Sequence, residues 1–428
     1  MRVHLTALGC RLNEAELETW SRQFLLRGHE VTGDAASADL VVVNTCAVTQ
    51  EAVRKSRKLL RRSHRENPRA KLLVSGCYAS LDPAETAQTL GVDLIVDNRQ
   101  KDRLVEIATR ELNLLSMPQM ATEPGASPLF ARGRHRAFVK VQDGCRYRCT
   151  YCIVTLARGE ERSRPIADVV AEVNQLHGEG IREAVLAGVH LGGYGSDCGS
   201  SLSELIKAVL NDTDMERIRL GSLEPWDLPP GFWNLFDHPR LMPHLHLPLQ
   251  SGSNPVLRRM ARRCSADAFA ALVRSARSRV PDLNVTTDVI VGFPGETEAE
   301  WQRTLEVVED IGFGHLHIFA YSPRPGTKAA ALPGQVGEEI KKSRSQELHR
   351  LGKVLERDTL ARFVGRSPRV LIEGRSASRP DRWFGYTPNY LPILIEHDQS
   401  ADLSNQILEI RTLEPDPDSE ALRGIPLT

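Results

Sequence analysis

The sequence lacks long apolar runs and is poor in aromatic residues. Phe, Trp and Tyr together make up 5% of its 428 residues. No stretch approaches the ~18 consecutive apolar residues that cross a bilayer. Residues 1–31 also lack the apolar core of roughly 7–15 residues that marks a secretory signal peptide. We therefore expect a soluble protein of the cytoplasm with no membrane segment.

An excess of charge of either sign is also missing. Lys and Arg total 55 residues, and Asp and Glu also total 55. The net charge therefore identifies no partner, and only the distribution of basic residues can do so. The sequence shows neither a catalytic triad nor a pair of catalytic carboxylates, so nothing in it favours acid–base chemistry as the main reaction.

Cysteine is sparse as well, with eight residues in the chain. In a reducing cytosol a disulfide framework is not expected, and clustered thiols indicate a metal site or catalysis. Six of the eight cysteines fall into two groups. The other two, Cys198 and Cys264, match no ligand pattern and are expected to be incidental.

The length of the chain predicts two or three domains, because one domain usually contains ~100–200 residues. In residues 1–115, apolar strands at Val3–Leu8, Leu40–Val43 and Leu72–Val74 alternate with helical patterns. This alternation predicts an α/β domain with a doubly wound parallel sheet. Residues 116–133 contain three prolines and are expected to form a linker.

Residues 134–358 repeat the alternation of strand and helix. The six expected strands are Phe138–Gln142, Glu183–Ala187, Arg217–Leu220, Leu245–Leu249, Val285–Ile290 and His315–Phe319. Six such units predict a partial (βα)6 barrel, with its chemistry at the carboxyl ends of the strands. Residues 359–428 instead contain short strands separated by turn residues, which predicts a small β-barrel.

Three cysteines follow the first expected strand of the (βα)6 barrel, and we name Cys145, Cys149 and Cys152 the barrel triplet. The C-x3-C-x2-C spacing places three thiols on one tight loop. Thiolates are the usual ligands of iron–sulfur clusters, and four irons normally take four of them. A triplet therefore leaves one iron open for a substrate. A structural zinc is the alternative, although zinc prefers paired C-x2-C units and four protein ligands.

Cys10, Cys46 and Cys77, here named the sheet triplet, lie far apart in sequence but share a context. Each follows the carboxyl end of an expected strand and precedes a helix. In an open parallel sheet such ends share one edge, where ligands bind. The alternative is three buried structural cysteines. The sharper hypothesis is a second cluster, with the sheet triplet and the barrel triplet facing one shared cavity.

Two triplets in this order resemble the methylthiotransferases of the radical S-adenosylmethionine (SAM) superfamily. The resemblance covers essentially the whole chain. It implies an N-terminal cluster domain, a radical SAM barrel and a C-terminal RNA-binding module of the TRAM type. It further implies a 4Fe–4S cluster on each triplet. The barrel cluster would cleave SAM to a 5′-deoxyadenosyl radical, and the other cluster would carry the sulfur that is methylated and inserted.

Glycine-rich and polar segments end several of the expected barrel strands. Glycine lets the backbone approach a ligand closely, and the resemblance implies that these strand ends line the SAM site. Candidates for direct contact are Glu224, Gln250 and Ser251. The expected SAM site comprises Gly188, Gly192, Ser222, Glu224, Gln250 and Ser251.

Basic residues are concentrated between Arg54 and Arg69, where eight of them stand against one acid. Six share one face at helical spacing, which suits contacts to phosphates, although a solvated surface helix would look the same. The six are Arg54, Arg57, Lys58, Arg61, Arg62 and Arg65. A second basic group is Arg132, Arg134 and Arg136, and a third is Arg258, Arg259, Arg262 and Arg263. Aromatic residues of the last segment, Trp383, Phe384, Tyr386 and Tyr390, either stack on RNA or form the core of the small barrel.

The family resemblance also bears on the acceptor. Its members modify isopentenyladenosine in tRNA, threonylcarbamoyladenosine in tRNA, or an aspartate of a ribosomal protein. The segments 44–49 and 190–195 resemble the threonylcarbamoyl branch. They imply methylthiolation at C2 of N6-threonylcarbamoyladenosine at position 37, next to the anticodon. Because that C–H is not acidic and offers no leaving group, the reaction needs radical chemistry.

Three alternatives remain open at the level of sequence. One is the same chemistry on isopentenyladenosine tRNA or on ribosomal protein. Another is a zinc-stabilised RNA-binding protein without catalysis, which would contain neither iron nor sulfide. The third, an iron–sulfur electron carrier, is disfavoured by the SAM-site motifs. The sequence identifies neither the electron donor nor the sulfur source, and nothing in it suggests an extensive dimer surface, so a monomer is expected.

Overall fold

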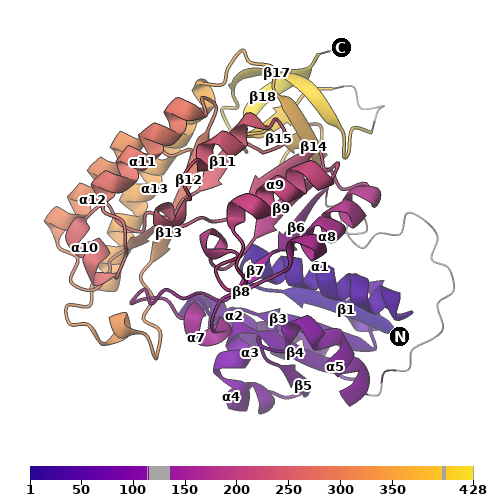
Figure 1. Ribbon diagram of the computed structural model, residues 1–428. Coiled ribbons are helices and arrows are strands. Elements are labelled where there is room, and N and C mark those ends of the chain that lie inside the picture. The colour runs from indigo at the N-terminus through magenta and orange to yellow at the C-terminus, as the bar shows by residue number, and fades with distance from the viewer. Residues whose placement is uncertain (113, 115–134, 398–401, 428) are drawn as a thin grey trace.

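The computed structural model describes residues 1–112, 114, 135–397 and 402–427. The linker expected at residues 116–133 lies outside the described residues. Figure 1 shows an N-terminal sheet domain at the bottom, a larger barrel in the middle and a small yellow β-barrel at the top. Within the described residues, every helix is too short or too polar to cross a membrane.

The N-terminal domain is a five-stranded parallel sheet in the order β2-β1-β3-β4-β5. All six residues of the central strand β3 are buried, because helices cover both faces of the sheet. Its strands are β1 (Arg2–Ala7), β2 (Glu30–Thr32), β3 (Leu40–Thr45), β4 (Lys71–Gly76) and β5 (Val92–Val96). Its α-helices are α1 (Arg11–Leu26), α2 (Gln50–Glu66), α3 (Cys77–Leu81), α4 (Pro83–Ala87) and α5 (Leu104–Glu111). The expected doubly wound fold is confirmed.

The middle part contains six parallel strands in two sheets of three, β10-β9-β6 and β11-β12-β13. Isolated bridges from Ile218 to Leu241 and from Ser222 to His246 join the two sheets. The strands are β6 (Arg136–Lys140), β9 (Glu183–Ala187), β10 (Arg217–Leu220), β11 (His244–His246), β12 (Asn284–Val291) and β13 (His315–Ala320). No pairing between β6 and β13 is seen in the described part of the chain, so the expected partial barrel is confirmed.

Helices surround these strands and bury one continuous apolar core. They are α7 (Val154–Arg158), α8 (Ile166–Gly178), α9 (Leu202–Asp212), α10 (Asn254–Arg259), α11 (Ala266–Arg279), α12 (Glu298–Ile311) and α13 (Glu338–Ala361). A short hairpin of β7 (Gln142–Asp143) and β8 (Arg162–Ser163) closes the loop that carries the barrel triplet. This hairpin holds the two ends of the loop together.

The C-terminal part is a closed barrel in the order β14-β15-β16-β18-β17, as expected. Its strands are β14 (Arg369–Arg375), β15 (Trp383–Tyr386), β16 (Pro392–Ile395), β17 (Ile407–Pro415) and β18 (Leu422–Pro426). Arg217 and Arg219 of β10 donate hydrogen bonds to the backbone carbonyls of Tyr386, Thr387 and Pro388. These bonds dock the small barrel against the amino-terminal part of β10, and Asn284 at the start of β12 adds a bond to the Asn389 carbonyl.

Candidate active site

A cavity of about 820 Å³ lies where the three parts of the chain meet. The loops after β1 and β3 and the start of α3 line it from the sheet domain, and the ends of the barrel strands line it from the middle part. Tyr386 and Tyr390 of the small barrel close another side. The cavity therefore includes the carboxyl ends of strands in both parts, where such folds bind ligands. On the barrel side it also extends along the strands to Asn284 and His315 at their amino ends.

The sheet triplet converges on this cavity: Cys10, Cys46 and Cys77 all line it. Their approach depends on a glycine, because a Cβ at Gly9 would lie 2.7 Å from the Cys46 sulfur, and Gly9 has a φ of +107°. Burial, together with the neighbouring Cys77 and Cys10, raises the pKa of the Cys46 thiol to about 11. A bound cation would stabilise the thiolates that this burial disfavours.

Two asparagines that sequence reasoning missed contact the sheet triplet. The Asn13 Oδ1 lies 3.9 Å from the Cys10 sulfur, and the Asn98 Nδ2 lies 3.8 Å from the Cys77 sulfur. Asn98 also donates to the carbonyl of Ala157 in α7 at 2.8 Å. The thiols of Cys10 and Cys77 therefore each contact an asparagine whose amide also bonds to another segment. Neither asparagine belongs to a recognisable motif.

The barrel triplet forms a compact, half-buried loop. Burial raises the pKa of Cys145 to about 12 and that of Cys152 to about 11, and neighbouring thiols of the triplet add to both shifts. The backbone N–H of Tyr147 donates to the Cys145 sulfur at 3.4 Å. These three thiols are close enough to interact. Because a 4Fe–4S cluster normally takes four thiolates, three of them fit a cluster that has one open ligand position.

The two triplets do not line the cavity equally. Only the sheet triplet is part of the lining, while the barrel triplet loop runs into α7, whose Val154 and Arg158 do line it. Of the six thiols expected to face one cavity, the three of the sheet triplet therefore line it, and the loop of the barrel triplet adjoins the lining through α7.

Four of the six expected SAM-site residues lie in positions that suit ligand contact. Gly188 and Ser222 line the cavity. Glu224 forms an ion pair with Arg262 at 2.8 Å, and its charge raises the pKa of Cys149, so it lies beside the barrel triplet. Gln250 has a φ of +71°, and its buried Oε1 has no hydrogen-bond partner in the described part of the chain.

The other two expected SAM-site residues are occupied within the protein. Ser251 is fully buried, and its hydroxyl lies 3.2 Å from that of Thr304 in α12. Gly192 packs on Asp227, because a Cβ at Gly192 would lie 2.8 Å from the Asp227 Cβ. The left-handed backbone at Gln250 turns the chain so that the next side chain faces a helix. Both positions are therefore held by contacts within the protein.

His190 forms the centre of a polar network that sequence reasoning did not recognise. Its Nδ1 lies 2.5 Å from Glu161 and its Nε2 lies 2.7 Å from Asp227. The Tyr147 hydroxyl donates to Asp227 at 2.6 Å. Burial lowers the pKa of His190, but the two carboxylates outweigh it and raise the pKa above its usual value. Ligand atoms of Cys145, Glu161 and His190 all lie within 4.8 Å of one another.

A buried ionic network joins the sheet domain to the barrel. The Arg158 guanidinium, 2% exposed, donates to Glu16 at 2.9 Å, to Asp143 at 3.0 Å and to Asn13 at 2.9 Å. Lys101 also contacts Glu16, at 2.5 Å. Arg158 thus holds α1 against the loop of the barrel triplet and places a positive charge beside the sheet triplet.

The basic groups expected to meet RNA differ in exposure. On α2 all of the expected residues are exposed except Arg57, which is ion-paired with Glu85 at 2.5 Å. Of the second group, positions 132 and 134 lie outside the described residues, and Arg136 pairs with Glu373 at 2.5 Å.

In the third group the Arg262 side chain is buried, stacks on Trp226 at 4.3 Å and lies close to the Cys149 thiol. The expectation of a surface role for Arg262 is wrong, because its charge is used beside the barrel triplet.

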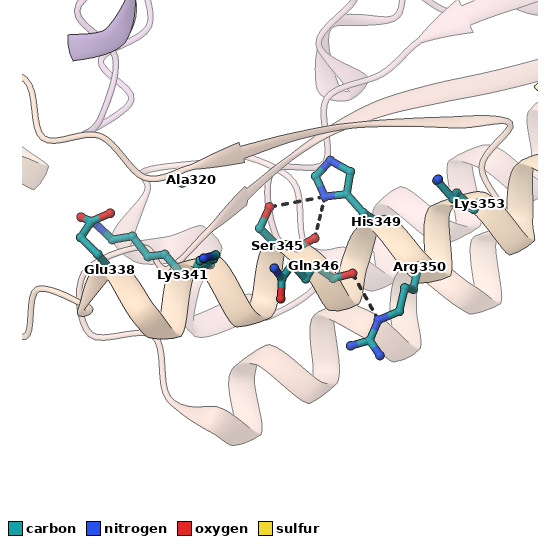
Figure 2. Close-up of a pocket in the computed structure, with 9 residues that line it drawn as sticks. Ala320, Glu338, Lys341, Ser345, Gln346, His349, Arg350 and Lys353 are labelled. Carbon is teal, nitrogen blue, oxygen red and sulfur yellow. Dashed lines mark hydrogen bonds and ion pairs between the residues drawn. The ribbon is translucent and has the colours of Figure 1, made fainter.

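A groove of about 710 Å³ follows one face of α13 and was not expected from the sequence. Figure 2 shows its basic side chains along the helix, with His349 bonded to Ser345 one turn earlier. A smaller hollow of about 320 Å³ shares His349 and Lys353 with this groove and shares His315 and His317 with the central cavity. A concave path therefore runs from the basic groove to the cavity.

Known proteins resemble this chain in both sequence and fold. Residues 2–97 match the model described as uncharacterized protein family UPF0004, and residues 139–308 match that of the radical SAM superfamily. A threonylcarbamoyladenosine tRNA methylthiotransferase, MtaB, of Thermotoga maritima is 39% identical over 381 residues, covering 87% of this chain and 86% of that protein. The MtaB of Bacillus subtilis is 34% identical and covers 95% and 92%.

Solved structures extend the likeness of fold. The radical SAM methyltransferase TsrM of Kitasatospora setae superposes with a TM-score of 0.59 at 16% identity, over 77% of this chain and 75% of that one. At this identity the match shows the fold alone. Since both family models match in the expected order, and full-length relatives exceed 30% identity, the chain belongs to the radical SAM methylthiotransferase family.

Proposed function

We propose that this enzyme adds a methylthio group to C2 of N6-threonylcarbamoyladenosine at position 37 of tRNA. The observation that carries the proposal is the convergence of the sheet triplet with the barrel strand ends on one cavity. Four relatives at 34–39% identity are named for the threonylcarbamoyladenosine acceptor. Relatives named for dimethylallyladenosine, such as that of Akkermansia muciniphila at 32% identity, are also similar, which makes that acceptor the runner-up.

The enzyme uses SAM and 4Fe–4S clusters, and we assign one cluster to each triplet. When bound, the barrel cluster supplies the electron that cleaves SAM, and the other cluster carries the sulfur to be inserted. The three thiols of each triplet leave one ligand position for SAM or sulfur. Arg262 offsets the negative charge beside Cys149, and Arg158 does the same beside Cys10 and Cys77.

The residues proposed to hold SAM surround the barrel triplet and the adjoining wall of the cavity. Glu224 and Gln250 offer polar groups for the amino acid and nucleoside parts of SAM, and Gln250 has an unsatisfied oxygen to offer. Gly188 and Ser222 leave room for the backbone to approach a ligand closely. Gly192 and Ser251 support this wall from behind.

We propose that tRNA docks through two basic surfaces. One is the exposed face of α2, whose first turn follows the Cys46 loop, and the other is the groove along α13 that leads to the cavity. Phosphate contacts of this kind supply affinity without reading sequence. Tyr386 and Tyr390, stacked 4.5 Å apart at 9°, present aromatic surface to a base inside the cavity. With this acceptor the enzyme would work in the cytoplasm, as a monomer supplied with a reductant and a sulfur source.

The first test combines metal content with acceptor choice. After anaerobic reconstitution we expect about eight irons per chain, falling to about four when Cys145, Cys149 and Cys152 are all replaced by Ala. With SAM and reductant, mass spectrometry should detect methylthiolation of an anticodon stem–loop carrying threonylcarbamoyladenosine. Modification of the dimethylallyladenosine stem–loop alone would overturn the acceptor, and zinc without sulfide would overturn the mechanism.

A further inference from the structure

Arg11 is the one arginine lining the cavity that has no carboxylate partner among the described residues. The other lining arginine, Arg158, is paired with Glu16 and Asp143. Among the described residues the Arg11 guanidinium contacts two aromatic rings, lying 5.8 Å from the centre of Phe138 and 5.7 Å from that of Tyr390. An unpaired guanidinium in a concave site is suited to binding a carboxylate or a phosphate.

Histidines near Arg11 are neutral, and two of the three lining carboxylates are held by other histidines. Burial, neighbouring histidines and Arg11 itself lower the pKa of His317 to about 4, and burial with Arg219 lowers that of His244. Both rings are therefore neutral at pH 7. The lining carboxylate of Asp288 lies 3.2 Å from His246, and that of Glu356 lies 3.0 Å from His315. The third lining carboxylate is Glu420, so among the described residues Arg11 is the lining cation that is not ion-paired with a carboxylate.

The position of Arg11 relates this charge to the reaction. Arg11 follows Cys10 directly and begins α1, so its side chain leaves the same loop that carries a sheet-triplet thiol. The acceptor carbon must approach that triplet to receive sulfur, which brings the rest of the base close to Arg11. A threonylcarbamoyl group on N6 ends in a free carboxylate, whereas a dimethylallyl group is apolar.

We propose that Arg11 binds the carboxylate of the threonylcarbamoyl group and so selects this acceptor over its uncharged analogues. The inference rests on the proposed function and deepens it. Arg11 fixes the orientation of the base by a charge-assisted contact, and the neutral His244 and His317 lie beside it as donors or acceptors for the uncharged part of the group. The stack of Tyr386 and Tyr390 lies on the same side of the cavity as Arg11.

The test measures binding of the reconstituted enzyme to three stem–loops of one sequence by fluorescence anisotropy. They carry threonylcarbamoyladenosine, its carboxamide analogue, or adenosine at position 37. Wild type should prefer the carboxylate over the carboxamide by ~10–100-fold, the usual effect of one charged hydrogen bond. R11Q should bind both equally, and R11K should keep part of the preference. R54Q, on the exposed face of α2, should weaken binding to all three RNAs and keep the ratio.

Several outcomes would overturn the inference. Equal binding of carboxylate and carboxamide by wild type does so without any variant, which covers the case in which R11Q loads iron poorly. An equal loss for all three RNAs in R11Q would assign Arg11 to a phosphate, and weaker SAM binding with an intact ratio would assign it to SAM. Methylthiolation of the first stem–loop by the same wild-type preparation tests the proposed function separately, so failure of that function is distinguishable.

Discussion

At the scale of the residue, small changes beside the thiols decide whether a cluster can form. Gly9 has a backbone conformation that L side chains rarely adopt, and its missing Cβ makes room for the Cys46 sulfur. Gly9→Ala should therefore displace the sheet triplet and lower iron from about eight to about four per chain, with the barrel cluster retained.

Iron and sulfide analysis with electron paramagnetic resonance of the reduced protein checks this expectation. Gly33→Ala is the matched control, because a Cβ there meets nothing within 4 Å. Full iron content in the Gly9 variant would show that the loop adapts.

Arg158 is the second residue-scale feature. Replacing it with Met leaves Glu16 and Asp143 buried without their shared partner. Loss of one member of a buried ionic network commonly costs about 3–5 kcal/mol. In the full-length Arg158→Met variant, we expect the sheet domain to unfold at a clearly lower urea concentration than in wild type. Arg103→Met breaks only an exposed pair with Glu106 and should leave the urea midpoint nearly unchanged. Similar midpoints for the two variants would contradict the role of the network.

At the scale of the element, α2 is a helix anchored at one end and charged along its free face. The Thr49 hydroxyl accepts from the N–H of Ala52 and caps the helix, while Leu60 packs into the sheet domain. The remaining face carries the exposed basic residues. Changing Arg54, Lys58 and Arg61 together to Gln should weaken tRNA binding and reduce its salt dependence by a slope of ~2–3, since each lost phosphate contact removes about 0.7–0.9.

Titration of labelled tRNA at several salt concentrations measures this slope. Arg110→Gln on α5, an exposed arginine paired with Glu111, serves as the control and should leave the slope unchanged. An unaltered slope in the triple variant would contradict phosphate contacts by α2 and would leave the α13 groove as the proposed RNA surface.

At the scale of the whole molecule, the small barrel is part of the active site because it is docked by buried charge. Glu183 is fully buried and pairs with Arg219 at 2.8 Å and with Arg217 at 2.9 Å. The two guanidinium groups then reach the carbonyls of residues 386–388. Arg219→Met should loosen this contact and speed hydrogen exchange in β15 and β16, whereas Arg423→Met, on a partly exposed pair of the same barrel, should not. Unchanged exchange in both variants would show that apolar packing alone holds the barrel.

The pairing of Glu183 also predicts a dependence on pH. Burial raises the pKa of this carboxyl, but Arg219 and Arg217 outweigh it and lower the pKa to about 2. A carboxyl with a lowered pKa in the folded state contributes stability above its usual pKa and loses it as pH falls toward the folded value. The docked barrel should therefore loosen between about pH 4.5 and pH 2, and hydrogen exchange of β15 across that range checks it.

The sequence by itself determined the order of the three folds, the two cysteine groups and the family. Alternating apolar and helical periods mark buried parallel strands, so β1, β3, β4 and the six barrel strands were predictable. Strands β2 and β5 escaped because one is three residues long and the other is mostly half-exposed. The spacing of cysteines on a single loop depends only on neighbouring residues, so the barrel triplet could be recognised from the sequence alone.

Only the tertiary structure decided which side chains surround those thiols. Arg262 and Arg57 looked like free surface charges, but Arg262 is buried, and the pairing of the two depends on Glu224 and Glu85, which are distant in sequence. The contact of the Ser251 hydroxyl with Thr304 of α12, 53 residues away, could not be read from the sequence either. Arg11 belongs to no recognised motif. Its proposed role rests on a guanidinium that has no carboxylate partner among the described residues, in a cavity that three parts of the chain build. The physical reason is that strand order is set by local periodicity, whereas charge pairing and access to a cavity depend on contacts between segments far apart in the chain.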